Sequence, residues 1–277
     1  MEYVQLTISA ENDLHEILIA ELFDFGFDGF EEQDKQLVAS IPADKFDFTK
    51  REEIEEILRK LGEAESVMKE EIIEEKNWNQ AWEKSIKPQT IGKFFVHPTW
   101  TKQEGGIDTI ELIIDPKMAF GTGYHPTTRV MLEWMPEVVE QGDTVLDAGT
   151  GTGILAIAAL KLGAGSAFGF DVDEWSEMNA SENLYLNGVS NFEVKRGSVE
   201  VIPDHEKYDL IFANINRNAL AEMSGDLIQH LKPNGKLLLS GLLLEDEEAM
   251  LNLKSLSDLD HVETKTHGEW IAILFQG

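Results

Sequence analysis

Over the first 76 residues, apolar and polar positions follow the periods of a small α+β domain. The stretch YVQLTIS alternates as a half-buried strand does, and apolar residues then recur every three or four positions, as on one face of a helix: Leu14, Ile17, Leu18, Leu22 and Phe25. Two short strand patterns, FDGFEEQD and KQLVASIP, precede a charged helix over 49–61, and SVMKEEIIEE gives a last strand. The order βαββαβ predicts a ferredoxin-like arrangement, an antiparallel sheet with two helices on one face. Because residues 1–76 carry no recognisable catalytic group, we interpret them as a binding or positioning domain, with a purely structural cap as the alternative.

Residues 77–100 predict a connector. The stretch NWNQAWEKSIKPQTIGKFFVHPTW is rich in tryptophan, and Pro88 and Pro98 interrupt any helix there. Large aromatic side chains gain from burial, and the glycine and serine content of a flexible tether is absent. We therefore expect this connector to pack against its neighbours.

Residues 101–277 predict a second domain, in which strand and helix patterns alternate from about Thr109. The strands are TVLDAG, SAFGFDVD, NFEVKRG, YDLIFAN and GKLLLSGLL, and the helices that separate most of them are ILAIAALKLG, EWSEMNASENLYLNG and LAEMSGDLIQHLKPN. Strands this apolar are covered on both faces, so the pattern predicts an α/β fold with a doubly wound parallel sheet. HVETKTHGEWIAILFQG predicts two further strands around His267 and Gly268, an antiparallel hairpin that finishes the sheet.

A glycine-rich turn follows the first strand of this alternation. In DAGTGTGILAIAALKLGA, every second residue after Ala148 is a glycine: Gly149, Gly151 and Gly153. A dinucleotide site has the spacing GxGxxG, and Ile154 stands where its third glycine would be. Asp171 ends the next strand, 22 residues after Gly149, where a carboxylate can accept both hydroxyls of a ribose. The turn has no basic residue before Lys161 to pair with a pyrophosphate, which favours a cationic nucleoside ligand; a tight turn without a ligand is the alternative.

Two further segments bring polar side chains toward this turn. Asn214 follows the apolar run of IFANINRN, where its amide could orient a reacting group or cap the next helix. Upstream, DPKMAFGTGYHPTT enters a helix at about Thr127, and Thr128 with the loop amides could close over the ligand from the opposite side. In this loop, His125 fits a hydrogen-bonded loop residue better than a base. Asp173 is expected to cap the helix that follows it.

The composition and the net charge limit the kinds of partner and of site that we expect for this chain. The formal net charge of -29, from 52 acidic residues against 23 lysines and arginines, repels phosphate backbones and favours a basic macromolecule as partner. A solvated surface without a charged partner is the alternative. With no cysteine, the chain has no disulfide framework, thiolate metal site or cysteine nucleophile. No apolar run reaches the roughly 18 residues that span a bilayer, and the N-terminus lacks a secretory pattern. We therefore expect a soluble, cytoplasmic protein.

Together these segments resemble the class I S-adenosylmethionine-dependent methyltransferases and, within them, the PrmA family of ribosomal protein L11 methyltransferases. The resemblance rests on DPKMAFGTGYHPTT, VLDAGTGTGILAIAALKLGA, GFDVD with NASENLYLNG, and FANI, and it runs from about Trp78 to the last residue. It implies a seven-stranded class I methyltransferase sheet, a substrate-recognition role for residues 1–76 and S-adenosyl-L-methionine as cofactor. The cofactor-binding positions that it implies are Thr128, Gly149, Gly151, Gly153, Asp171 and Asn214.

The resemblance also implies the reaction, which is methylation of lysine side chains and of the N-terminal amine of that ribosomal protein. Asn214 would orient the amine as the catalytic residue. We expect a monomer that binds no metal, no membrane and no nucleic acid directly. In two departures from many relatives, Thr150 replaces a cysteine, and INRN after Asn214 places the charge of Arg217 near the site, which bears on substrate choice.

Three alternatives stay open. The same chemistry could act on another protein or on a small amine, because the sequence defines the methyl donor better than the acceptor. A nicotinamide oxidoreductase uses the same kind of sheet. A cofactor-sensing or ribosome-assembly protein could retain the fold without turnover.

Overall fold

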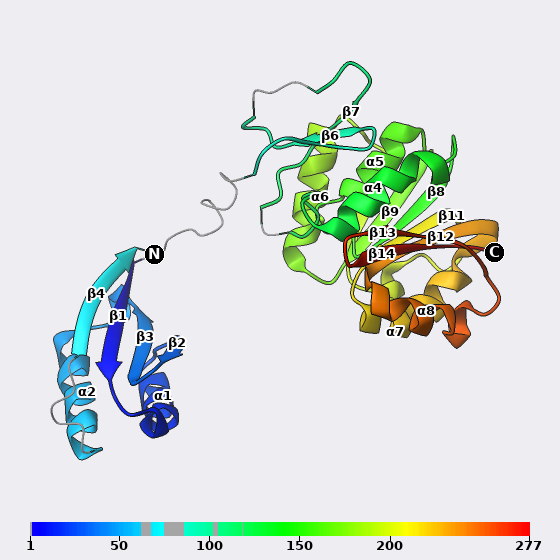
Figure 1. Cartoon of the computed structure of the whole chain (residues 1–277). Helices are drawn as coiled ribbons and strands as arrows, with labels where there is room; N and C mark the ends of the chain where they lie inside the picture. The colour runs from blue at the N-terminus through cyan, green and yellow to red at the C-terminus, as the bar shows by residue number, and fades with distance from the viewer. Residues whose placement is uncertain (1, 62–67, 75–85, 102–104, 118) are drawn as a thin grey trace. The chain divides into compact units, whose positions relative to one another are not determined.

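The computed structural model describes residues 2–61, 68–74, 86–101, 105–117 and 119–277 (Figure 1). The chain divides into two compact units, Met1–Trp78 and Asn79–Gly277. The first nine residues of the predicted connector, 77–85, lie outside the described residues, as does Gly62 after the predicted charged helix. In the described ranges, every helix is too short or too polar to cross a bilayer.

The N-terminal unit has the predicted βαββαβ order. Its elements are β1 (Glu2–Ser9), α1 (His15–Asp24), β2 (Gly29–Gln33), β3 (Gln36–Pro42), α2 (Phe48–Lys60) and β4 (Met68–Glu74). The four strands pair antiparallel in the order β2-β3-β1-β4, which confirms the ferredoxin-like arrangement. Alternate residues of β1 face one side of the sheet, where Leu6 and Ile8 are buried with Leu22 of α1 and Ile54 of α2.

The second unit contains the predicted seven-stranded sheet. Its strands are β8 (Thr144–Ala148), β9 (Ser166–Asp171), β10 (Phe192–Arg196), β11 (Tyr208–Asn214), β12 (Leu231–Leu243), β13 (Asp260–His267) and β14 (Trp270–Gln276). They lie in the order β10-β9-β8-β11-β12-β14-β13, with the first five parallel. β14 runs antiparallel to both β12 and β13, so the predicted terminal hairpin is confirmed.

Helices cover both faces of this sheet (Figure 1). They are α4 (Pro126–Val138), α5 (Ile154–Leu162), α6 (Glu174–Leu186), α7 (Arg217–Gln229) and the short α8 (Glu247–Leu251). Successive strand residues belong to different cores: Val145 of β8 is buried with α4 and α5, whereas Leu146 is buried with α7 and α8. This two-sided burial explains why the parallel strands are almost continuously apolar.

One sheet of the second unit was not predicted. β5 (Gln89–Ile91), β6 (Phe94–His97) and β7 (Ile110–Ile113) form a three-stranded sheet in that order. Its strands are three or four residues long, and prolines flank them in the sequence, so the pattern shows no clear period. The expected division between residues 100 and 101 falls inside this sheet.

The sequence predicts a helix over 220–234. In the structure the helix is α7, which runs from Arg217 to Gln229, and β12 already begins at Leu231. Asn216 caps α7, since its Oδ1 accepts from the backbone N of Ala219 at 3.0 Å. At the other end, Leu231 already pairs with Tyr208 of β11, and Pro233 cannot continue a helix. The apolar spacing alone does not reveal either boundary.

Candidate active site

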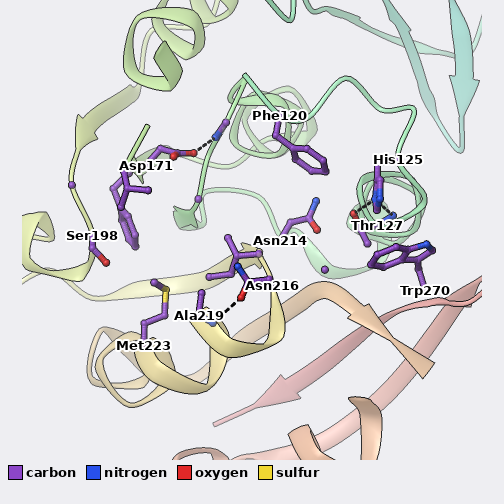
Figure 2. A pocket seen from close by; sticks show the side chains of 17 residues that line it. Phe120, His125, Thr127, Asp171, Ser198, Asn214, Asn216, Ala219, Met223 and Trp270 are labelled. Atoms are coloured by element: carbon purple, nitrogen blue, oxygen red, sulfur yellow. Dashed lines mark hydrogen bonds between the residues drawn. The ribbon is translucent and has the colours of Figure 1, made fainter. Parts of the chain in front are cut away.

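A cavity of about 490 Å³ opens where β8, β9 and β11 end (Figure 2). Its wall comes from the glycine turn after β8, the end of β9, the turn between β11 and α7, the loop before α4, and the start of β14. The carboxyl ends of parallel strands are where doubly wound sheets bind their ligands. The volume lies in the range of small-molecule sites, about 300–1,000 Å³.

The glycine turn brings backbone to the cavity wall. Gly149 and Gly151 line the cavity and have positive φ angles of 74° and 53°. A Cβ on Gly151 would lie 2.2 Å from the backbone oxygen of Phe120, so a side chain cannot fit there without moving the neighbouring loop. Gly153 begins α5 and faces Ala180 of α6, and it is not among the residues that line the cavity.

Asp171 joins the end of β9 to the glycine turn. Its Oδ2 accepts from the backbone N of Gly151 at 2.9 Å, and its Oδ1 accepts from the backbone N of Asp173 at 3.0 Å. Each carboxylate oxygen can accept more than one hydrogen bond, so Asp171 keeps capacity for hydroxyl groups of a ligand. Asp173 accepts from the backbone N of Trp175 at 3.0 Å and caps α6, as predicted.

Asp147, directly before the turn, is a buried structural group. It is 1% exposed and is not among the residues that line the cavity. Its Oδ2 accepts from the hydroxyl of Thr150 at 2.8 Å and from the backbone N of Ala156 at 3.3 Å. Its Oδ1 has no hydrogen-bond partner in the described part of the chain. Burial raises the pKa of Asp147 to about 6, against the stabilising hydrogen bonds from Thr150 and Ala156.

Asn214 lies in the cavity wall at the end of β11, where its amide contacts α4. Asn214 Nδ2 donates to Thr128 Oγ1 at 3.2 Å, whereas Asn214 Oδ1 is buried and accepts no hydrogen bond from the described residues. Thr128 is fully buried and does not line the cavity, although its neighbour Thr127 does. The structure thus joins Thr128 to Asn214.

Three aromatic side chains form one end of the cavity (Figure 2). The ring of His125 lies 5.4 Å from Phe120 and 4.6 Å from Trp270, centroid to centroid. His125 also caps α4, because its Nδ1 accepts from the backbone N of Thr127. Burial lowers the pKa of His125, so its ring is neutral at pH 7. Figure 2 shows Asn214 between this aromatic end and the end that holds Asp171.

Several wall residues escaped sequence reasoning because no motif marks them. Ser198 and Met223 line the cavity near Asp171, and Gly241 and Trp270 come from β12 and β14. The sequence holds one local signal for these wall residues, which is Trp270 at the start of an apolar strand. Arg217, expected near the site, forms an ion pair with Asp246 at 3.0 Å and does not line the cavity.

Comparisons with known proteins agree on one family. The model of the family "Ribosomal protein L11 methyltransferase (PrmA)" matches residues 2–277. The chain is 36% identical to the ribosomal protein L11 methyltransferase of Chlorobaculum parvum, over 99% of this chain and 96% of that protein. It is also 36% identical to the protein of that name from Porphyromonas gingivalis, over 98% and 92%. A solved ribosomal protein L11 methylase from Lactobacillus delbrueckii subsp. bulgaricus is 29% identical, with a TM-score of 0.63 over 69% of this chain and 98% of that one.

Proposed function

The chain belongs to the PrmA family of ribosomal protein L11 methyltransferases, and from this premise we propose that it methylates lysine side chains and the N-terminal amine of ribosomal protein L11. The observation that carries the proposal is the place of Asn214 in the cavity wall, where the end of β11 reaches the cavity. A carbonyl oxygen accepts a hydrogen bond from an amine N–H. The position of Asn214 between Asp171 and the aromatic end suits an acceptor amine that meets a nucleoside cofactor.

The residues of the cavity fit S-adenosylmethionine. Asp171 would accept the ribose hydroxyls, and the turn at Gly149 and Gly151 would hold the methionine portion against backbone. Val172 and Met223 add apolar surface to the cavity wall, against which the adenine ring of the cofactor would pack. When bound, this cofactor supplies an electrophilic methyl group on a positively charged sulfur.

The acceptor amine must be neutral to react. For a lysine of ordinary pKa, deprotonation at pH 7 costs about 4 to 5 kcal/mol. Phe120, Trp270 and the neutral ring of His125 would take the amine out of water, and desolvation disfavours its charged form. Asn214 would then fix its orientation, and positioning can supply about 7 to 11 kcal/mol of the barrier.

His125 does not serve as the base in this scheme. Its Nδ1 faces Thr127, 2.7 Å from the hydroxyl Oγ1 and 3.4 Å from the backbone N, and this contact holds the ring as the cap of α4. Orientation by Asn214 and exclusion of water carry the reaction instead.

Substrate capture would use the other parts of the chain. We assign Met1–Trp78 to recognition of the ribosomal protein, and Asn79–Gly277, which includes the sheet of β5, β6 and β7, to methyl transfer by a cytoplasmic monomer. The net charge of -29 would attract a basic protein and disfavour direct contact with nucleic acid. The second candidate, methylation of another protein or a small amine, uses the same cavity and differs only in the acceptor.

Mass spectrometry of unmethylated L11 incubated with the protein and S-adenosylmethionine tests the proposal. Wild type should add multiples of about 14 Da to lysines or the N-terminal amine, the mass of a methyl group replacing a hydrogen. Asn214→Ala should bind the cofactor in calorimetry but transfer poorly, while Asn191→Ala, outside the cavity, should match wild type. Cofactor binding without any gain on L11 would refute this acceptor and favour the second candidate.

A further inference from the structure

A second cavity adjoins the aromatic end of the active site. Its volume is about 480 Å³, and the two cavities share Phe120 and His125. The rest of its wall comes from the loop before α4 and the first residue of that helix: Ala119, Gly121, Thr122, Tyr124 and Pro126. Because the cofactor would fill the end at Asp171, an acceptor amine reaches Asn214 from the aromatic end (Figure 2). The second cavity therefore lies beside the path along which the acceptor enters.

Two aromatic side chains of this wall are open to a ligand. Phe120 is 55% exposed and Tyr124 is 45% exposed. Exposed aromatic side chains around a hollow are typical of a surface that binds another chain. The Tyr124 hydroxyl donates to the backbone O of Lys87 at 2.7 Å and accepts from the backbone N of the same residue. Since these contacts use the hydroxyl, the ring is the part of Tyr124 that a ligand would meet.

The loop that carries both aromatic side chains is held from two sides. Toward the glycine turn, Thr152 donates from its backbone N to the backbone O of Phe120 at 2.8 Å, and from its hydroxyl to the backbone O of Gly121 at 2.6 Å. On the other side, a Cβ on Gly123 would lie 3.0 Å from Ile91 of β5, so the loop packs closely on the three-stranded sheet. A wall that is already in place binds a ligand without the cost of ordering a loop.

We propose that the second cavity is a subsite for the polypeptide segment next to the target amine, and that the ring of Tyr124 favours a protein acceptor over a small amine. The proposal rests on the proposed function. Apolar parts of the segment would pack against Phe120 and Tyr124, and a basic residue beside the target could lie over an aromatic face. A small amine has no chain to place there and would gain nothing from the subsite.

Three variants and a photo-cross-linker test the proposal. Tyr124→Ala removes the ring, Tyr124→Phe keeps the ring without the hydroxyl, and Tyr185→Ala is the matched control on α6, outside both cavities. For each, calorimetry gives the Kd of S-adenosylmethionine, and steady-state kinetics with L11 give kcat and KM. Separately, p-benzoylphenylalanine replaces Tyr124 or Tyr185, the protein is illuminated with L11, and mass spectrometry locates the cross-linked residue of L11.

Tyr124→Ala should raise the KM for L11 about tenfold, a loss typical of an aromatic anchor in an interface. Its kcat and its cofactor Kd should stay within about twofold of wild type, the agreement expected for groups that do not touch the changed residue. Tyr124→Phe should lie closer to wild type than Tyr124→Ala does, and Tyr185→Ala should match wild type. The cross-linker at position 124 should attach to the peptide of L11 that holds a methylated amine, whereas the one at 185 should not.

An unchanged KM in Tyr124→Ala, a cofactor Kd weakened as much as the KM, or cross-links from position 124 that lie away from every methylated amine would overturn the proposal. The cross-linker keeps an aromatic group at position 124, so it decides the case if the alanine variant does not fold. Failure of the proposed function is distinct, because wild type would then leave L11 unmodified. Failure of this inference alone leaves L11 methylated equally well by wild type and by Tyr124→Ala.

Discussion

Replacing Asp147 by asparagine should change how the stability of the protein depends on pH. Asp147 is buried beside the glycine turn, and its Oδ1 has no partner in the described part of the chain. Burial disfavours the charged form and raises the pKa from 3.8 to about 6. The folded protein therefore keeps this proton at pH values where the unfolded chain has released it.

The sign and size of the pH effect on stability follow from the difference between the pKa of Asp147 in the folded and in the unfolded protein. Between pH 3.8 and about 6 the folded state binds the extra proton, so rising pH favours unfolding, and the full effect above pH 6 is about 3 kcal/mol. Over the accessible range from about pH 4.5 to 7.5, the same relation gives about 2 kcal/mol. Asparagine does not titrate, so its free energy of unfolding should rise relative to wild type by that amount. Any loss from an unpaired Nδ2 adds the same offset at every pH.

Urea unfolding followed by tryptophan fluorescence measures this difference. All tryptophans except Trp78 lie in Asn79–Gly277, so the signal reports mainly on the unit that contains Asp147. Thr150→Val is the matched variant: it removes a hydrogen bond that favours the charged form, so it should lose stability relative to wild type over the same pH range. A difference between Asp147→Asn and wild type that stays constant from about pH 4.5 to 7.5 would refute the reasoning.

Three further predictions concern ligand binding. Gly151→Ala should weaken cofactor binding in calorimetry and lower stability by about 1 to 3 kcal/mol, because its φ is 53° and a Cβ would meet the Phe120 oxygen; wild-type affinity would contradict this. Asp171→Ala should weaken S-adenosylmethionine binding about tenfold or more, as expected for the loss of charge-assisted hydrogen bonds; equal Kd values would exclude Asp171 from ribose binding. Added salt should weaken capture of L11 more than binding of the cofactor, because net charge steers the basic protein. Equal salt dependence of the two affinities would count against a role for the acidic surface.

Much of the fold was predictable because its elements carry their own signals. The apolar runs of β8, β9 and β11 indicate buried parallel strands, and Gly26 and Gly163 indicate where helices end. The three-stranded sheet of β5, β6 and β7 was missed because its strands are too short to show a period. In addition, β6 pairs with β7, which does not follow it directly in sequence, and no local pattern indicates that pairing.

The site was predictable where backbone geometry demands particular residues. Gly149, Gly151 and Asp171 line one cavity because a strand end, a tight turn and the next strand end must meet there. Thr128 came from a resemblance of motifs, which does not distinguish a residue in the wall from one that holds a wall residue. Trp270 reaches the cavity only through the order of the strands, and no local pattern encodes that order.

That order also sets the sequence in which parts of the site can form while the chain is synthesised. β14 lies between β12 and β13, so β13 cannot join the sheet until β14 exists. The N-terminal unit has its last strand by Glu74 and can fold on a chain that has not reached this point. A nascent chain can therefore form the glycine turn before Trp270 completes the aromatic end, and the ability to hold an acceptor is acquired late in biosynthesis.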